Sequence, residues 1–101
     1  MTTNPPIVSP ARGVDDIAQE VLQSQVPWVV LLHNDDHHDM EYVVDSLCKV
    51  VDILSTQEAI EIMIEAHIKG VATVGSWRLE LVEYYRDRIQ SFGLTVTIEK
   101  A

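Results

Sequence analysis

The sequence predicts an α+β fold, a compact βααβαβ sandwich in which three helices back a small antiparallel sheet. Two kinds of pattern indicate this class. Short apolar or alternating runs at 28–33, 71–74 and 94–98 are typical of strands. Longer stretches between them carry apolar residues at helical spacing. Because neither kind of element can bury its apolar face alone, we expect one sheet and one helical layer around a single core.

The first half of the body contains one strand and two helices. Residues 28–33 form a run between Pro27 and Asn34 that is apolar up to Leu32, which predicts a buried strand. A helix is expected over 40–51, and its apolar residues are Met40, Val43, Val44, Leu47, Val50 and Val51. Ser55 and Glu58 form a capping-box pattern that opens the next helix. Gly70 is placed to end that helix as a left-handed cap.

The second half of the body repeats the pattern. A short strand is expected over 71–74, between Gly70 and Gly75. A third helix is expected from about 78 to 92, and Gly93 ends it. The alternation over 94–98 predicts the last strand.

Residues 1–26 differ in composition from the body, with three prolines and few large apolar groups. Residues 14–24 have the pattern of a short amphipathic helix, but an isolated helix of that length is marginal in water. We therefore expect a flexible N-terminal extension over 1–26, helical only against a partner. Residues 27–101 are expected to form a single folded domain.

Charge and composition restrict the partners. The chain has 16 acidic and 7 basic residues, for a formal net charge of -9. This balance argues against nucleic acid and anionic membranes, which bind through Lys and Arg. No apolar run is long enough to cross a bilayer, and the N-terminus lacks the pattern of a secretory signal. The single cysteine, Cys48, excludes an internal disulfide and fits a reducing compartment.

An acceptor-rich segment, residues 33–39, follows the first strand and is called the acceptor loop below. It reads His-Asn-Asp-Asp-His-His-Asp, and its short side chains are suited to converge on one small cation. Asp and Asn are also favoured as turn and helix N-cap residues, which is the alternative explanation for each of them singly. That explanation accounts poorly for so many acceptors in succession.

Two helix faces offer an apolar pocket beside this loop, if loop and second helix meet. The residues concerned are Met40, Val43, Leu47, Met63 and Ala66. Such a stripe is more often simply core. His67 follows this face, where a histidine is more often a satisfied core residue than a ligand.

Two other functions, metal binding and catalysis, would also use residues of this chain. A metal site at the acceptor loop would use His33, His37, His38 and the neighbouring aspartates, which are plausible ligands for Zn²⁺ or Ni²⁺. An enzyme would use His67 as a general base or Cys48 as a nucleophile. No phosphate-binding loop, nucleophile elbow or zinc-hydrolase motif supports the enzyme, and no cofactor is expected.

The order of the motifs over about 27–101 resembles the ClpS family, adaptors that deliver N-degron substrates to the Clp AAA+ protease. The resemblance is carried by Leu31-Leu32-x-Asn34-Asp35-Asp36, Met40-Glu41-Tyr42-Val43, Ala66-His67-x-x-Gly70, Gly75, Glu80 and Thr97-Ile98-Glu99-Lys100. It implies a non-enzymatic, monomeric adaptor in the bacterial cytoplasm or the plastid stroma. Its partners would be a ClpA- or ClpC-type unfoldase and proteins beginning with Leu, Phe, Tyr or Trp.

The resemblance also implies roles for individual residues. The substrate's free α-amine would be bound by Asn34, Asp35, Asp36 and His67. Its side chain would enter a pocket lined by Leu32, Met40, Val43, Leu47, Met63 and Ala66, with Met40 as the gatekeeper. An α-amine is mostly cationic at neutral pH and has three donors, so converging acceptors suit it.

The chain departs from the family pattern at three places. His38-Asp39 stands where Thr-Pro is common, which suggests a more mobile loop and a more polar rim. Ala66 replaces a larger aliphatic residue, which would reshape the pocket. In the expected unfoldase-docking segment, Glu80, Glu83, Tyr84 and Tyr85, a tyrosine replaces the usual lysine at 85. A changed docking partner, or metal binding at the acceptor loop, is therefore the alternative function.

Overall fold

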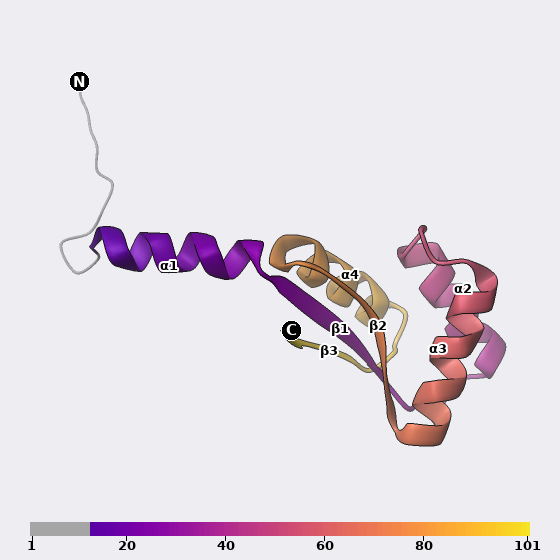
Figure 1. The fold of residues 1–101 in the computed structure, drawn as a ribbon. Coiled ribbons are helices and arrows are strands. Elements are labelled where there is room, and N and C mark those ends of the chain that lie inside the picture. Colours follow the sequence, from indigo (N-terminus) through magenta and orange to yellow (C-terminus); the bar gives the residue numbers. More distant parts are fainter. Residues whose placement is uncertain (1–12) are drawn as a thin grey trace.

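The computed structural model describes residues 13–101. Its sheet has three strands in the order β2-β1-β3, and both pairings are antiparallel. The central strand is β1 (Pro27–His33), flanked by β2 (Val71–Arg78) and β3 (Val96–Lys100). The helices of the body are α2 (Met40–Val50), α3 (Thr56–Lys69) and α4 (Leu79–Ser91). The predicted α+β class and the βααβαβ order of the body are confirmed (Figure 1).

A single apolar core joins the sheet to the three helices. Alternate residues of β1 are buried, so the strand covers the core with one face only. Side chains with little or no exposure come from every element of the body: Val30, Leu32, Leu47, Val51, Ala59, Ala72, Val82, Ile89 and Val96.

The ends of α3 form as the sequence predicts. The Ser55 hydroxyl accepts from Glu58 N at 3.0 Å, and the Glu58 carboxylate accepts from Ser55 N at 2.9 Å. This reciprocal pair satisfies two backbone donors that the first helical turn would otherwise leave free. Gly70 has φ 91°, a left-handed conformation that strongly favours glycine, and its N–H donates to Ala66 O.

The strand after α3 is longer than predicted, because Gly75 lies inside β2 rather than at its end. The pairing with β1 shifts there: Val30 faces Gly75, whereas Leu31 faces Thr73, which leaves Val74 as the extra residue of a β-bulge. A Cβ atom at position 75 would collide with the Trp77 indole ring. Glycine is therefore required for close packing at this point, not for a turn.

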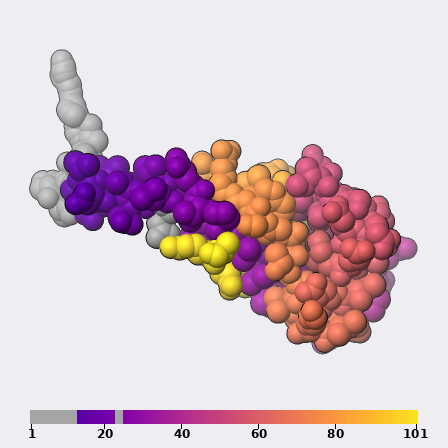
Figure 2. Space-filling view, in the orientation of Figure 1, coloured from indigo at the N-terminus to yellow at the C-terminus, as the bar shows by residue number. Residues whose placement is uncertain are grey.

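The N-terminal segment contains a helix over the stretch, residues 14–24, whose sequence has the pattern of a short amphipathic helix. Helix α1 (Val14–Gln25) runs directly into β1 and projects from the body as a rod (Figures 1 and 2). The Asp16 carboxylate accepts from Gly13 N at 3.3 Å and so stabilises its first turn. Val14 is 81% exposed and Leu22 55%, so its apolar side is largely uncovered. The rest of the predicted extension, residues 1–12, lies outside the described residues.

Candidate functional site

A pocket lies where the acceptor loop meets the start of α2 and the second half of α3. Its lining residues are Leu32, His33, Asn34, Asp35, His38, Met40, Val43, Met63, Ala66 and His67. Its empty volume, taken out to the open mouth, is about 300 Å³. That is at the small end of ligand sites in proteins, so the pocket suits one side chain with its adjoining main chain.

Two backbone hydrogen bonds fix the acceptor loop beside α3. His33 N donates to Thr95 O and Asn34 N donates to Gly70 O, both at 2.9 Å. The second bond joins the end of β1 to the glycine that ends α3, about one turn after His67. Because the chain must then reach the start of α2 at Met40, the loop passes across the mouth of the pocket.

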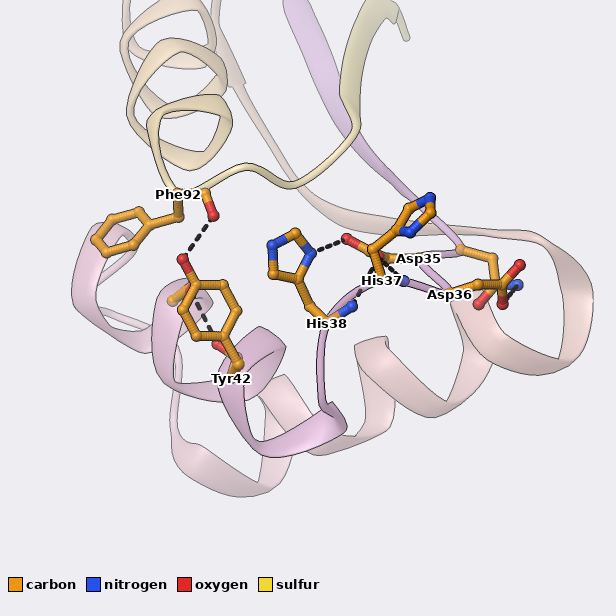
Figure 3. Close-up of polar contacts among 8 residues, drawn as sticks. Asp35, Asp36, His37, His38, Tyr42 and Phe92 are labelled. Atoms are coloured by element: carbon orange, nitrogen blue, oxygen red, sulfur yellow. Dashed lines mark hydrogen bonds and ion pairs between the residues drawn. The ribbon is translucent and has the colours of Figure 1, made fainter.

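Asp35 is the most strongly held side chain of the loop. Its Oδ1 accepts from His37 N at 2.6 Å and from His38 N at 3.1 Å, and its Oδ2 lies 2.6 Å from His38 Nδ1 (Figure 3). Its side chain is only 7% exposed. Burial acts to raise the pKa of Asp35, but the hydrogen bonds from His37 and His38 outweigh it and lower that pKa. The carboxyl group is therefore an anion at neutral pH.

The other polar lining residues retain unused acceptors. Asn34 Nδ2 donates to Asp36 Oδ1 at 3.4 Å, which uses one of the two N–H donors of the Asn34 amide. Within residues 13–101, the Asn34 amide oxygen and the His67 ring have no hydrogen-bond partner. Both residues are exposed at the mouth, so these atoms are accessible to a ligand.

The apolar part of the pocket has a buried aliphatic floor and a rim of two methionines. Leu32, Val43 and Ala66 are 2%, 6% and 3% exposed and belong to the core. Met63 is half-buried, whereas Met40 is 52% exposed at the mouth. Methionine is unbranched and adaptable, so Met40 is able to adjust to the shape of an entering side chain.

The lining contains all of the predicted pocket and amine-binding residues except Asp36 and Leu47. Leu47 is fully buried in the core, because it lies on the inward side of α2 rather than toward the mouth. Asp36 is exposed, and among residues 13–101 its side chain is bonded to the site through Asn34. Asp36 is therefore placed to orient the Asn34 amide rather than to line the pocket.

Two lining residues, His33 and His38, are not among the predicted pocket residues. His33 Nε2 lies 2.7 Å from the Thr97 hydroxyl on β3. His38 Nδ1 bonds Asp35. A signal for both is present in the sequence, since the histidines of the loop stand out as candidate metal ligands. Among residues 13–101, however, no three His, Cys, Asp or Glu side chains are arranged to hold a metal ion.

Cys48 and the expected docking residues lie away from the pocket. Cys48 is half-buried against the core and does not line the site. On α4, Glu80 and Tyr84 are exposed and Glu83 is half-buried. Tyr85 is only 7% exposed and packs edge-to-face on Trp77. Burial, followed by the charges of Asp52 and Tyr84, raises the pKa of Tyr85. Position 85 is thus a core position in this chain, not part of an exposed docking surface.

The fold and the site together define a small binding domain: an apolar pocket with a carboxylate, an amide oxygen and an imidazole at its mouth. Within the described residues, no helix is both long enough and apolar enough to traverse a bilayer.

Comparison with known proteins identifies the family. The family model described as ATP-dependent Clp protease adaptor protein ClpS matches residues 23–97. The ClpS adapter protein of Synechococcus sp. (strain CC9902) is 42% identical over 101 residues, covering 98% of this chain and 97% of that protein. The chain belongs to the ClpS family; it is a Clp protease adaptor and not an enzyme.

Two further relatives extend the comparison. The chloroplastic adapter CLPS1 of Chlamydomonas reinhardtii is 42% identical over 91 residues, covering 89% of this chain and 53% of that protein. A solved structure of Agrobacterium tumefaciens ClpS2 bound to L-phenylalaninamide superposes with a TM-score of 0.71 at 26% identity, covering 75% of this chain and 98% of that one. Bacterial and chloroplastic relatives support the predicted location in the bacterial cytoplasm or the plastid stroma.

Proposed function

We propose that this adaptor binds the free α-amine and the large hydrophobic side chain of N-degron substrates and delivers them to a Clp AAA+ unfoldase. The observation that carries the proposal is the composition of one pocket: an ionised, nearly buried carboxylate beside an apolar floor. A protein N-terminus with a large apolar first residue has the complementary chemistry, a cation next to a hydrophobic group.

The polar end of the pocket matches an α-ammonium group. Such a group has three N–H donors and is mostly cationic at neutral pH. The mouth offers the Asn34 amide oxygen, the Asp35 carboxylate and a His67 ring nitrogen, one acceptor for each donor. Acetylation of the N-terminus removes the charge and all but one donor. Free N-termini should therefore be bound and acetylated ones rejected.

The apolar end selects the first side chain. Burying a Leu or Phe side chain contributes about 1.5–3 kcal/mol, enough to separate it from Ala or Ser. The volume and the adaptable Met40 and Met63 at the rim suit a single large side chain. We expect proteins that begin with Leu, Phe, Tyr or Trp to be the substrates.

One relative supports this assignment directly. Agrobacterium tumefaciens ClpS2 was solved with L-phenylalaninamide, a molecule with a free α-amine and a phenyl side chain. This chain offers complementary groups for both in a single pocket. A similar ligand in this pocket would place its amine at the Asp35 end and its ring over Val43 and Ala66.

Delivery requires a second surface. We expect the solvent-accessible residues of α4, Glu80, Glu83 and Tyr84, to contact an unfoldase of the ClpA or ClpC type. None of them lines the pocket, so substrate and unfoldase would be bound at the same time by one monomer. The N-terminal extension, residues 1–26, is proposed to engage the unfoldase during transfer, while residues 27–101 form the adaptor core.

Fluorescence anisotropy with labelled peptides tests the proposal. Peptides beginning with Leu, Phe, Tyr or Trp are compared with peptides beginning with Ala and with N-acetylated twins of the same sequences. Saturable binding of the large hydrophobic termini that is lost on acetylation is expected. Equal binding of free and acetylated peptides, or no binding of any, would refute it.

A further inference from the structure

His38 is held on three sides, by Tyr42, Asp35 and Gly93. Its ring stacks on Tyr42 of α2, with centroids 4.8 Å apart and an interplanar angle of 13°. The Tyr42 hydroxyl donates to Phe92 O at 2.6 Å, at the end of α4 (Figure 3). Tyr42 thus joins the loop, through its stack on His38, to the end of α4, through its hydroxyl.

Gly93 forms the third side. A Cβ atom at this position would lie 3.2 Å from His38 Nε2 and 3.3 Å from Cε1, closer than ordinary contact. Its φ of 88° is also left-handed, which strongly favours glycine here. The imidazole is therefore confined between Tyr42 and the backbone of Gly93, and its freedom to turn away from Asp35 is small.

The hydrogen bond between His38 and Asp35 has a defined direction. An ionised carboxylate only accepts hydrogen bonds, so the proton must be on His38 Nδ1, which donates to Asp35 Oδ2. Two backbone N–H groups donate to Asp35 Oδ1. Since a carboxylate has about four acceptor positions, these three bonds leave roughly one of them for a ligand.

We propose that His38 is a positioning residue for amine recognition: its ring fixes the Asp35 carboxylate so that its one unused acceptor position is offered to the substrate's α-amine. The inference rests on the proposed function. His38 would act on the ligand indirectly, by orienting Asp35. The same contacts explain how the loop is held in place although His38-Asp39 stands where Thr-Pro is common in the family. The stack on Tyr42 supplies the rigidity, and the Nδ1–H supplies the orientation.

A pair of variants separates these two contributions. In His38→Asn, the amide nitrogen is attached to Cγ as Nδ1 is, so the donor to Asp35 is kept while the stacked ring is removed. In His38→Phe, the ring is kept and the donor is removed. Circular dichroism and thermal unfolding establish that both variants fold.

Affinity for a Phe-initiated peptide is the first readout. If His38 acts through its donor, His38→Phe should bind about tenfold or more weakly, the loss expected for a charge-assisted hydrogen bond, whereas His38→Asn stays within about threefold of wild type. The reverse order would show that only the stacked ring matters and would overturn the inference.

The second readout requires no ligand. The ¹³C chemical shift of the Asp35 carboxyl carbon is followed as the pH is lowered. The pH at the midpoint of this titration should be higher in His38→Phe than in wild type, but not in His38→Asn. An equal midpoint in all three proteins would overturn the inference. If the midpoints move as expected but wild type binds no free N-terminus, the hold on Asp35 is supported and the proposed function fails instead.

Discussion

Replacing Asp35 by Asn tests the amine site while preserving its shape. Asn keeps an oxygen that accepts from His37 N and His38 N, so these two backbone bonds should be retained, whereas the bond that Oδ2 accepts from His38 Nδ1–H is lost. The substitution removes the negative charge that faces the ligand. The Asp35 side chain is only 7% exposed, so its carboxylate has little direct contact with solvent.

The magnitude follows from the kind of interaction that the substitution removes. A hydrogen bond between charged partners contributes about 1.5–3 kcal/mol net, and about 1.4 kcal/mol corresponds to tenfold in affinity. Asp35→Asn should therefore weaken binding of a free Phe terminus by about 10- to 100-fold. The unfolding midpoint should change little by comparison.

Asp39→Asn is the matched control, because it removes the same charge from the same loop. Asp39 is exposed, does not line the pocket, and makes no side-chain cap to α2. Its variant should bind within about twofold of wild type, since exposed charges contribute little. Peptide anisotropy at constant ionic strength measures both variants. Equal losses in the two would show that net charge matters and would refute a specific role for Asp35.

Three further perturbations have defined outcomes. His67→Ala should weaken peptide binding about 3- to 10-fold by removing one acceptor, and His67→Gln should recover part of it; unchanged affinity in His67→Ala would contradict the role. Ser55→Ala removes the cap of α3 and should cost about 1 kcal/mol in urea unfolding, with peptide affinity unchanged. The third is acid destabilisation. Burial opposes ionisation of Asp35, but its hydrogen bonds place its folded pKa below 3.8. A carboxyl group whose pKa is lower in the folded than in the unfolded protein stabilises the fold. This stabilisation is complete at pH values above the unfolded pKa and is lost as the pH falls through the folded pKa. Stability should thus decline below about pH 4, and less steeply in Asp35→Asn.

The parts of the fold that depend on local chemistry were predictable from the sequence. The capping box at Ser55 and the left-handed Gly70 define the two ends of α3, because both act within a few residues of the chain. The length of β2 was not predictable in this way. A glycine in this sequence context is compatible with the end of a strand and also with a position inside a strand where an aromatic ring packs on the backbone. Only the position of the Trp77 ring in the folded protein distinguishes these two cases.

In the site, too, some residues were predictable from the sequence, whereas others depend on contacts that form only in the folded chain. Asn34, Asp35 and His67 were predicted from motif order and do line one pocket, because β1 and the end of α3 meet through Gly70. Leu47 was misplaced, since spacing alone does not tell which part of an apolar helix face meets the mouth. Tyr85 was misplaced for a related reason: its burial depends on Trp77, which lies on another element. The role of His38 depends on Tyr42 and Gly93, which approach it only in the folded chain.

Titration of the ¹⁵N-labelled protein with L-phenylalaninamide and, separately, with its N-acetylated form shows most directly whether this pocket binds a free N-terminus. We expect saturable shifts at the amides of Asn34, Asp35, Val43 and His67 with the free amine and almost none with the acetylated form. Shifts that are equal for both molecules, or that fall outside the lining of this pocket, would contradict binding of the amine at Asp35.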